Sequence, residues 1–104
     1  MNKELLKGNI DLLILSVVEE KESYGFEISK TIKEKTDGEF EIQEATLYLS
    51  LKRLEKQGAL SSSWGTESHG GRRKYYAITD EGVQLLASLT SDWKKVTEIV
   101  KRFI

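Results

Sequence analysis

The chain is short and nearly neutral, and these properties limit what it can be. Its 104 residues, 38% hydrophobic and 32% charged, suffice for one compact core and are too few for two independent domains. It has no cysteine, which excludes disulfide bridges, thiolate zinc sites and cysteine nucleophiles. The beginning of the chain is amphipathic and lacks a long apolar run, so we expect a cytoplasmic protein with neither signal peptide nor membrane span.

Positive charge is unevenly distributed along the sequence. The 16 basic and 17 acidic residues give a net charge of -1, which by itself argues against a nucleic-acid-binding protein. Residues 43–78, however, hold six basic and three acidic side chains, a net +3, whereas the remainder holds ten and fourteen, a net -4. The charge that could meet DNA is therefore concentrated in the central segment.

The first 42 residues predict two helices and a short strand. Apolar residues surround most of a helix over Leu5–Val18, so that helix needs cover on more than one side. Ser23 is a suitable N-cap for a second helix that ends near Gly38. Phe40 and Ile42 alternate with glutamates, which predicts a very short strand.

A third helix is predicted over residues 44–57. Leu47, Leu51 and Leu54 are spaced by four and three as its buried stripe, and Gly58 ends it.

Two strand-like runs, residues 60–64 and 72–78, then flank a glycine-rich segment, which predicts a hairpin. The order helix, helix, short strand, helix, hairpin is that of a winged helix-turn-helix. We therefore expect a mainly α fold with a small β-hairpin: a DNA-binding domain over residues 1–78 and a C-terminal dimerisation helix over residues 79–104, packed as one compact unit.

The outward face of the third helix suits DNA. At 100° per residue, small, hydroxyl and basic side chains lie opposite the leucines. These candidate DNA-binding residues are Ala45, Thr46, Tyr48, Leu49, Lys52, Arg53 and Lys56. Apolar groups can meet thymine methyl groups, and the cations can neutralise phosphates. An ordinary solvated face would explain the lysines but not an exposed Leu49 beside Tyr48.

The hairpin adds three adjacent cations, Arg72, Arg73 and Lys74, where a wing would leave its tip. They could contact the DNA backbone or minor groove, or could simply form a solubilising turn; their adjacency to the third helix favours the wing. Alternation places Tyr76 towards the core and Tyr75 on the other face.

The final helix, capped by Thr79, carries the most regular pattern of the sequence. Its apolar residues repeat every three or four positions as a heptad seam. The seam residues are Leu86, Leu89, Trp93, Val96, Val100 and Phe103. No later element covers this seam, which favours a symmetric homodimer, although packing on the first helix of the same chain is compatible with it.

Trp93 is unusually bulky for a heptad seam. In a two-fold dimer it would approach its symmetry mate, so that the two rings either pack as an aromatic core or bound a slot for a planar ligand; spacing alone slightly favours the core. No catalytic, metal or cofactor site is indicated, since the single histidine, His69, lies in a glycine-rich turn.

Four blocks of residues stand out in order and spacing: Tyr24–Ile28, Glu44–Tyr48, Lys52–Gly58 and Arg73–Gly82. Through these blocks the sequence resembles the PadR family of transcriptional regulators over nearly its whole length. The resemblance implies a dimeric winged-helix repressor that binds double-stranded operator DNA, exchanges its C-terminal helix between subunits and is released by a small molecule. Ala45 and Leu49 stand where the common family pattern has glycine and proline.

The closer resemblance is to short, multidrug-sensing members, through Trp64-Gly65 and the wing run 70–76. In that subgroup a tryptophan matching Trp93 sandwiches flat hydrophobic drugs across the dimer, so the resemblance favours the slot. The implied ligand-binding positions are Asp11, Leu12, Leu15, Leu89, Trp93 and Thr97. Thr97 replaces an expected acidic group. A protein-interaction module using the seam, and a ligand-binding or enzymatic domain using the Trp93 cavity, are the alternative functions.

Overall fold

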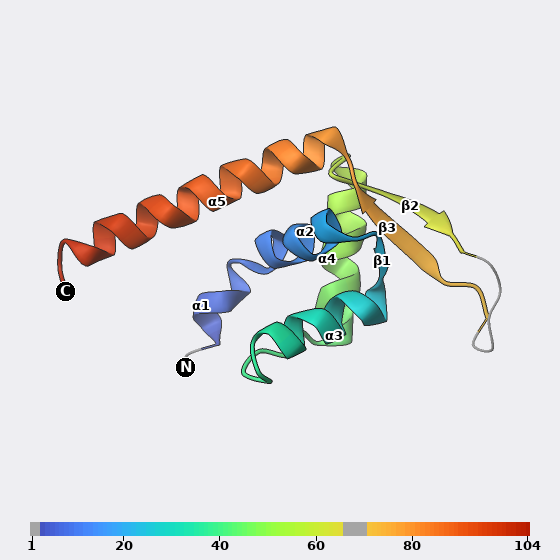
Figure 1. Cartoon of the computed structure of the whole chain (residues 1–104), viewed down its shortest axis with the longest axis horizontal. Helices are drawn as coiled ribbons and strands as arrows, with labels where there is room; N and C mark the ends of the chain where they lie inside the picture. Colours follow the sequence, from blue (N-terminus) through green and yellow to red (C-terminus); the bar gives the residue numbers. More distant parts are fainter. Residues whose placement is uncertain (1–2, 66–70) are drawn as a thin grey trace.

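The computed structural model describes residues 3–65 and 71–104 as a helical body, a small sheet and one long helix that leaves the body (Figure 1). The helices are α1 (Glu4–Lys7), α2 (Ile10–Glu20), α3 (Gly25–Lys35), α4 (Glu44–Lys56) and α5 (Asp80–Lys101), and the strands are β1 (Ser23–Tyr24), β2 (Leu60–Trp64) and β3 (Lys74–Ile78). In the described ranges, no helix is both long and apolar enough to cross a bilayer.

Helix α2 is the centre of the core, because it contacts α3, α4, α5 and β3. Leu15 and Val17 are buried although they lie on nearly opposite sides of it, which confirms that this helix needs more than one cover. The prediction of one unbroken helix from Leu5 was wrong, because α1 and α2 are separate. Asn9 donates its side-chain amide to the carbonyl of Leu5, a local bond that competes with the helix.

The third strand is not where the sequence pattern placed it. Ser23 was predicted to cap a helix, but it lies in β1 opposite Tyr76 of β3. Its hydroxyl donates to the carbonyl of Lys21 at 2.8 Å. Helix α3 begins two residues later, behind an extended Tyr24 and without a side-chain cap. The sheet order is β1-β3-β2, with both pairs antiparallel.

The predicted strand at Phe40 and Ile42 is absent. Both side chains are buried in the core, but the segment between α3 and α4 consists of turn and loop without strand pairing. The alternation therefore reflects burial of every second residue rather than a ladder, a distinction that periodicity alone cannot make.

The start of α5 is fastened to the end of α4. Thr79 accepts a hydrogen bond from the amide of Gly82 at 3.0 Å, which confirms the predicted N-cap, and donates its hydroxyl to the carbonyl of Gly58. Gly58 has φ +83°, a conformation that favours glycine, and a Cβ at Gly82 would collide with the carbonyl oxygen of Ala59. The direction in which α5 leaves the body is thus set by close backbone packing.

Candidate nucleic-acid interface

Helix α4 presents the predicted face to the surface. Leu47, Leu51 and Leu54 are buried, so the opposite side of the helix points away from the core. Six of the seven candidate residues are exposed, namely Ala45, Tyr48, Leu49, Lys52, Arg53 and Lys56, and Thr46 is half-buried. Their role in binding DNA stays a prediction.

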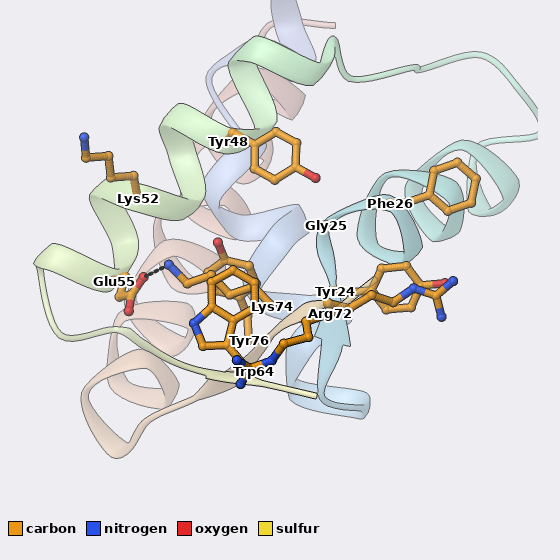
Figure 2. Close-up of a pocket in the computed structure, with 11 residues that line it drawn as sticks. Tyr24, Gly25, Phe26, Tyr48, Lys52, Glu55, Trp64, Arg72, Lys74 and Tyr76 are labelled. Atoms are coloured by element: carbon orange, nitrogen blue, oxygen red, sulfur yellow. Dashed lines mark ion pairs between the residues drawn. The ribbon is translucent and has the colours of Figure 1, made fainter. Parts of the chain in front are cut away.

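An open cleft of about 810 Å³ lies between α4, the first turn of α3 and the hairpin of β2 and β3, the wing (Figure 2). Tyr48, Lys52, Arg72, Arg73 and Lys74 line it together with Tyr24, Gly25, Phe26, Glu55, Trp64 and Tyr76. The structure thus joins part of α4 and the wing cations in one surface. Thr46 and Arg53 instead line a separate cavity of about 750 Å³ beside α1 and α2.

Several cations of this surface are available to an anionic partner. Within residues 3–65 and 71–104, Lys52, Lys56, Arg72 and Arg73 make no ion pair with a carboxylate, whereas Lys7, Lys33 and Lys35 elsewhere do. Charge without an internal partner can neutralise phosphates with little competition from the protein itself.

The wing cations are oriented by aromatic rings. The guanidinium carbon of Arg72 lies 5.6 Å from the ring centroid of Trp64, and that of Arg73 lies 4.6 Å from the centroid of Tyr24. The ammonium nitrogen of Lys74 lies 5.6 Å from the centroid of Tyr76. Such cation–π contacts orient a cation without neutralising it, so the wing keeps its positive charge in a defined place.

Glu55 ties the wing to α4. It accepts a hydrogen bond from the Ser62 hydroxyl at 2.5 Å and pairs with the ammonium of Lys74 at 3.4 Å, the dashed line of Figure 2. The Ser62 bond, with a smaller contribution from Lys74, holds the pKa of Glu55 below its ordinary value. Lys74 is therefore partly committed to the protein, unlike Arg72 and Arg73.

Arg53 of α4 forms an ion pair with helix α2. Its guanidinium pairs with the carboxylate of Asp11 on α2 at 2.5 Å. The sequence placed these two residues in different sites, Arg53 in the DNA set and Asp11 in the ligand set, and the structure brings them into contact. Any DNA contact by Arg53 must compete with this pair.

Sequence reasoning missed the aromatic wall of the cleft. Tyr48 packs against the head of α3, where a Cβ on Gly25 would lie 2.7 Å from its hydroxyl, and Figure 2 shows that hydroxyl directed towards Gly25. Phe26 and Trp64 are exposed on either side. The blocks Tyr24-Gly25-Phe26 and Trp64-Gly65 were visible signals, but nothing in their spacing showed that they meet.

The predicted seam emerges from the body along α5. Leu86 is buried and Leu89 is half-buried against the core, but the later residues are open: Trp93 is 51% exposed, Val96 58%, Val100 45% and Phe103 84%. The single chain therefore uses the first part of the seam internally and leaves the rest without cover from the described residues.

The predicted ligand positions lie in different surroundings. Leu15 is fully buried in the chain's own core and Leu12 is half-buried, whereas Trp93 is half-exposed. Thr97 donates its hydroxyl to the carbonyl of Trp93 at 3.0 Å. His69, predicted as a surface loop residue, lies outside the described residues.

The comparisons with known proteins agree with this architecture. Residues 14–88 match the family described as the transcriptional regulator PadR-like family. A transcriptional regulator from Clostridium thermocellum is 38% identical, with TM-score 0.92, covering 100% of this chain and 98% of that one. A PadR family transcription regulator from Clostridium difficile R20291 is 41% identical, with TM-score 0.81, covering 92% and 98%.

The structure of Bacillus subtilis PadR in complex with operator DNA is similar in fold, with TM-score 0.68 and 24% identity over 76% of this chain and 44% of that one. The predicted winged-helix class is thereby confirmed. The family consists of transcription regulators rather than enzymes. From the match over residues 14–88 and the shared winged-helix fold, the chain belongs to the PadR-like family of transcriptional regulators.

Proposed function

We propose that this chain is a cytoplasmic repressor that binds operator DNA as a homodimer and is released by a planar hydrophobic molecule. The observation that carries the DNA-binding part is a cluster of cations without a carboxylate partner among the described residues. Three of these cations, Lys52, Arg72 and Arg73, line one cleft, and Lys56 is exposed one turn further along α4, in a chain whose net charge is -1. Helix α4 enters the major groove and the wing follows the flanking backbone. The Bacillus subtilis PadR complex with operator DNA supports this assignment.

The homodimer is supported by the uncovered part of α5. Trp93, Val96 and Val100 leave an apolar stripe open on a helix whose second half has no other described element beside it, as Figure 1 shows. A second copy related by two-fold symmetry buries both stripes at once. In this proposal residues 1–78 recognise DNA, residues 79–104 hold the dimer, and the operator is partly palindromic.

The effector binds between the two Trp93 rings. Leu89 and Thr97 flank Trp93 on the same helix, and the half-buried Leu12 contributes from α2. Of the other two positions that the sequence suggested, Leu15 is fully buried in the chain's own core and Asp11 pairs with Arg53, so neither is part of the proposed slot. A ligand that separates the rings changes the distance between the two α4 helices and hence their fit to half-sites one turn apart.

The experiment is fluorescence anisotropy with labelled DNA from upstream of the gene, at two salt concentrations, with and without a planar aromatic cation. We expect specific, salt-sensitive binding that the cation weakens. Trp93→Ala should bind DNA but lose the response to the cation. If the cation does not change DNA binding, the proposed effector slot is wrong. If the protein binds no upstream or selected DNA, the DNA-binding regulator is wrong and the protein-interaction module becomes the preferred function.

A further inference from the structure

Aromatic residues are concentrated around the cleft between α4 and the wing. The chain has two tryptophans, four tyrosines and three phenylalanines, and five of these nine line the cleft. Phe26 is 65% exposed, Trp64 58% and Tyr48 46%. Large aromatic rings left open around one concave surface are typical of a binding site rather than of ordinary protein surface.

The charge of the cleft is strongly positive. Lys52, Arg72, Arg73 and Lys74 line it, with Glu55 as its one carboxylate in the described part of the chain. Glu55 pairs with Lys74, so these two charges largely offset each other and the net positive charge of the cleft comes from Lys52, Arg72 and Arg73. Arg72 and Arg73 lie against ring faces, which places guanidinium groups beside surfaces on which another ring can stack.

The wall of the cleft is built by close packing. The Tyr48 ring reaches the head of α3 only because Gly25 has no side chain, since a Cβ there would lie 2.7 Å from the Tyr48 hydroxyl. The cleft measures about 810 Å³, within the range of roughly 300–1,000 Å³ that small-molecule sites occupy. Figure 2 shows the rings of Tyr48 and Trp64 on different walls, from α4 and from β2.

We propose that this cleft binds a planar aromatic anion, a flat ring system that carries a phosphate or carboxylate group. The ring stacks on an exposed aromatic side chain while the anionic group meets Lys52, Arg72 or Arg73. This site differs from the one at Trp93 in every lining residue and in the charge of its ligand. Because the same cations face DNA under the proposed function, the bound anion competes with DNA directly; only this competition rests on that proposal.

The two tryptophans allow the two sites to be read separately. The full chain is labelled with 5-fluorotryptophan, and its two ¹⁹F resonances are assigned with Trp64→Phe and Trp93→Phe. The probes are adenosine monophosphate and 2-naphthoate, each with its uncharged partner, adenosine and 2-naphthamide. We expect at least one anion to shift the Trp64 resonance saturably without moving the Trp93 resonance, and its neutral partner to bind at least tenfold more weakly. The two arms distinguish a nucleotide from an aromatic acid.

Variants test the cations. Arg72→Gln combined with Arg73→Gln should weaken binding of the anion at least fivefold, as measured by calorimetry, whereas Lys95→Gln on α5 removes an exposed charge of the same sign and should change nothing. An unmoved Trp64 resonance with both anions, equal binding of the neutral partners, or a shift at Trp93 alone would overturn the site.

DNA competition is measured last, on the same protein. The anion should displace labelled operator DNA, and a complex that binds the anion and DNA independently would refute the competition. If no DNA binds at all, the proposed function fails, while the ligand site is still decided by the Trp64 resonance.

Discussion

Helices α4 and α5 carry similar apolar patterns but differ in how much of the apolar face the chain itself buries. Both repeat large apolar residues every three or four positions, yet the stripe of α4 is buried by the chain itself, while that of α5 is covered at Leu86 and open from Trp93 onwards. Helix α4 has 13 residues and α5 has 22. Helix α4 stays within the body of the molecule, whereas α5 extends beyond it, as Figure 1 shows. The pattern therefore identifies the apolar face, while helix length relative to the core decides whether that face needs a partner.

The largest expected effect concerns the buried stripe. Leu51→Ala should lower the free energy of unfolding by about 2–5 kcal/mol, because Leu51 is fully buried and the helix packed around it cannot close the cavity. Urea titration followed by circular dichroism measures it. Leu5→Ala, at an exposed leucine, is the matched control and should change stability by less than about 0.5 kcal/mol. Equal losses of stability in both variants would contradict the assignment of the core.

The open stripe should respond in association rather than in folding. Val100→Asp places a carboxylate in the proposed seam and should raise the dimer dissociation constant at least a hundredfold, about 2.7 kcal/mol, in sedimentation equilibrium. The winged helix itself should stay folded. Ser91→Asp introduces the same charge off the seam and should leave association unchanged. An undisturbed dimer in Val100→Asp would place the interface elsewhere.

The junction that sets the direction of α5 gives a smaller effect. Thr79→Ala removes the side-chain acceptor of the Gly82 amide and should cost about 1 kcal/mol of unfolding free energy, while Thr79→Ser keeps the cap and most of the stability. Thermal unfolding of the three proteins measures the difference. A serine variant as unstable as the alanine variant would show that the Thr79 methyl group, not the cap, matters.

The smallest expected effect on stability comes from removing the Glu55 carboxylate between α4 and the wing. Glu55→Gln should lower stability at neutral pH by roughly 0.2–1 kcal/mol, since the pair with Lys74 is partly exposed. The pKa of Glu55 is depressed below 4.5 mainly by the Ser62 bond, so its contribution is present above that pH and disappears as the pH falls through the folded-state pKa. Urea midpoints of the two proteins should therefore converge in acid. A difference that stays constant throughout the acid range would rule out the charge as the cause.

The elements that sequence predicted well are those specified locally. The stripe of α4, the Thr79 cap and the strands of the wing follow from spacing and residue type within a few positions. Strand β1 could not be found this way, because two residues become a strand only when Tyr76 of a distant segment pairs with Ser23. At the break before α2, the side chain of Asn9 donates a hydrogen bond to the carbonyl of Leu5. Such local side-chain bonds compete with helix formation, and the spacing of apolar residues gives no sign of them.

The same division holds for the candidate site. The outward face of α4 follows from helical geometry, and Arg72 and Arg73 follow from their position in the hairpin. The cleft does not, because its rings come from α3, α4 and the sheet, and only tertiary packing brings them together. Nor could spacing show that Arg53 pairs with Asp11, since these residues lie 42 positions apart.

The most direct test of the DNA-binding face is the salt dependence of operator binding in two matched variants. Arg72→Gln/Arg73→Gln and Lys94→Gln/Lys95→Gln each remove two adjacent cations, the first pair from the wing and the second from α5. We predict that the wing variant reduces the slope of log affinity against log salt by about 0.9 for each phosphate that the wing no longer neutralises. The α5 variant should keep the slope of the wild-type protein. An unchanged slope in the wing variant, or the same reduction in both, would contradict the assignment of the α4 and wing surface as the face that meets DNA.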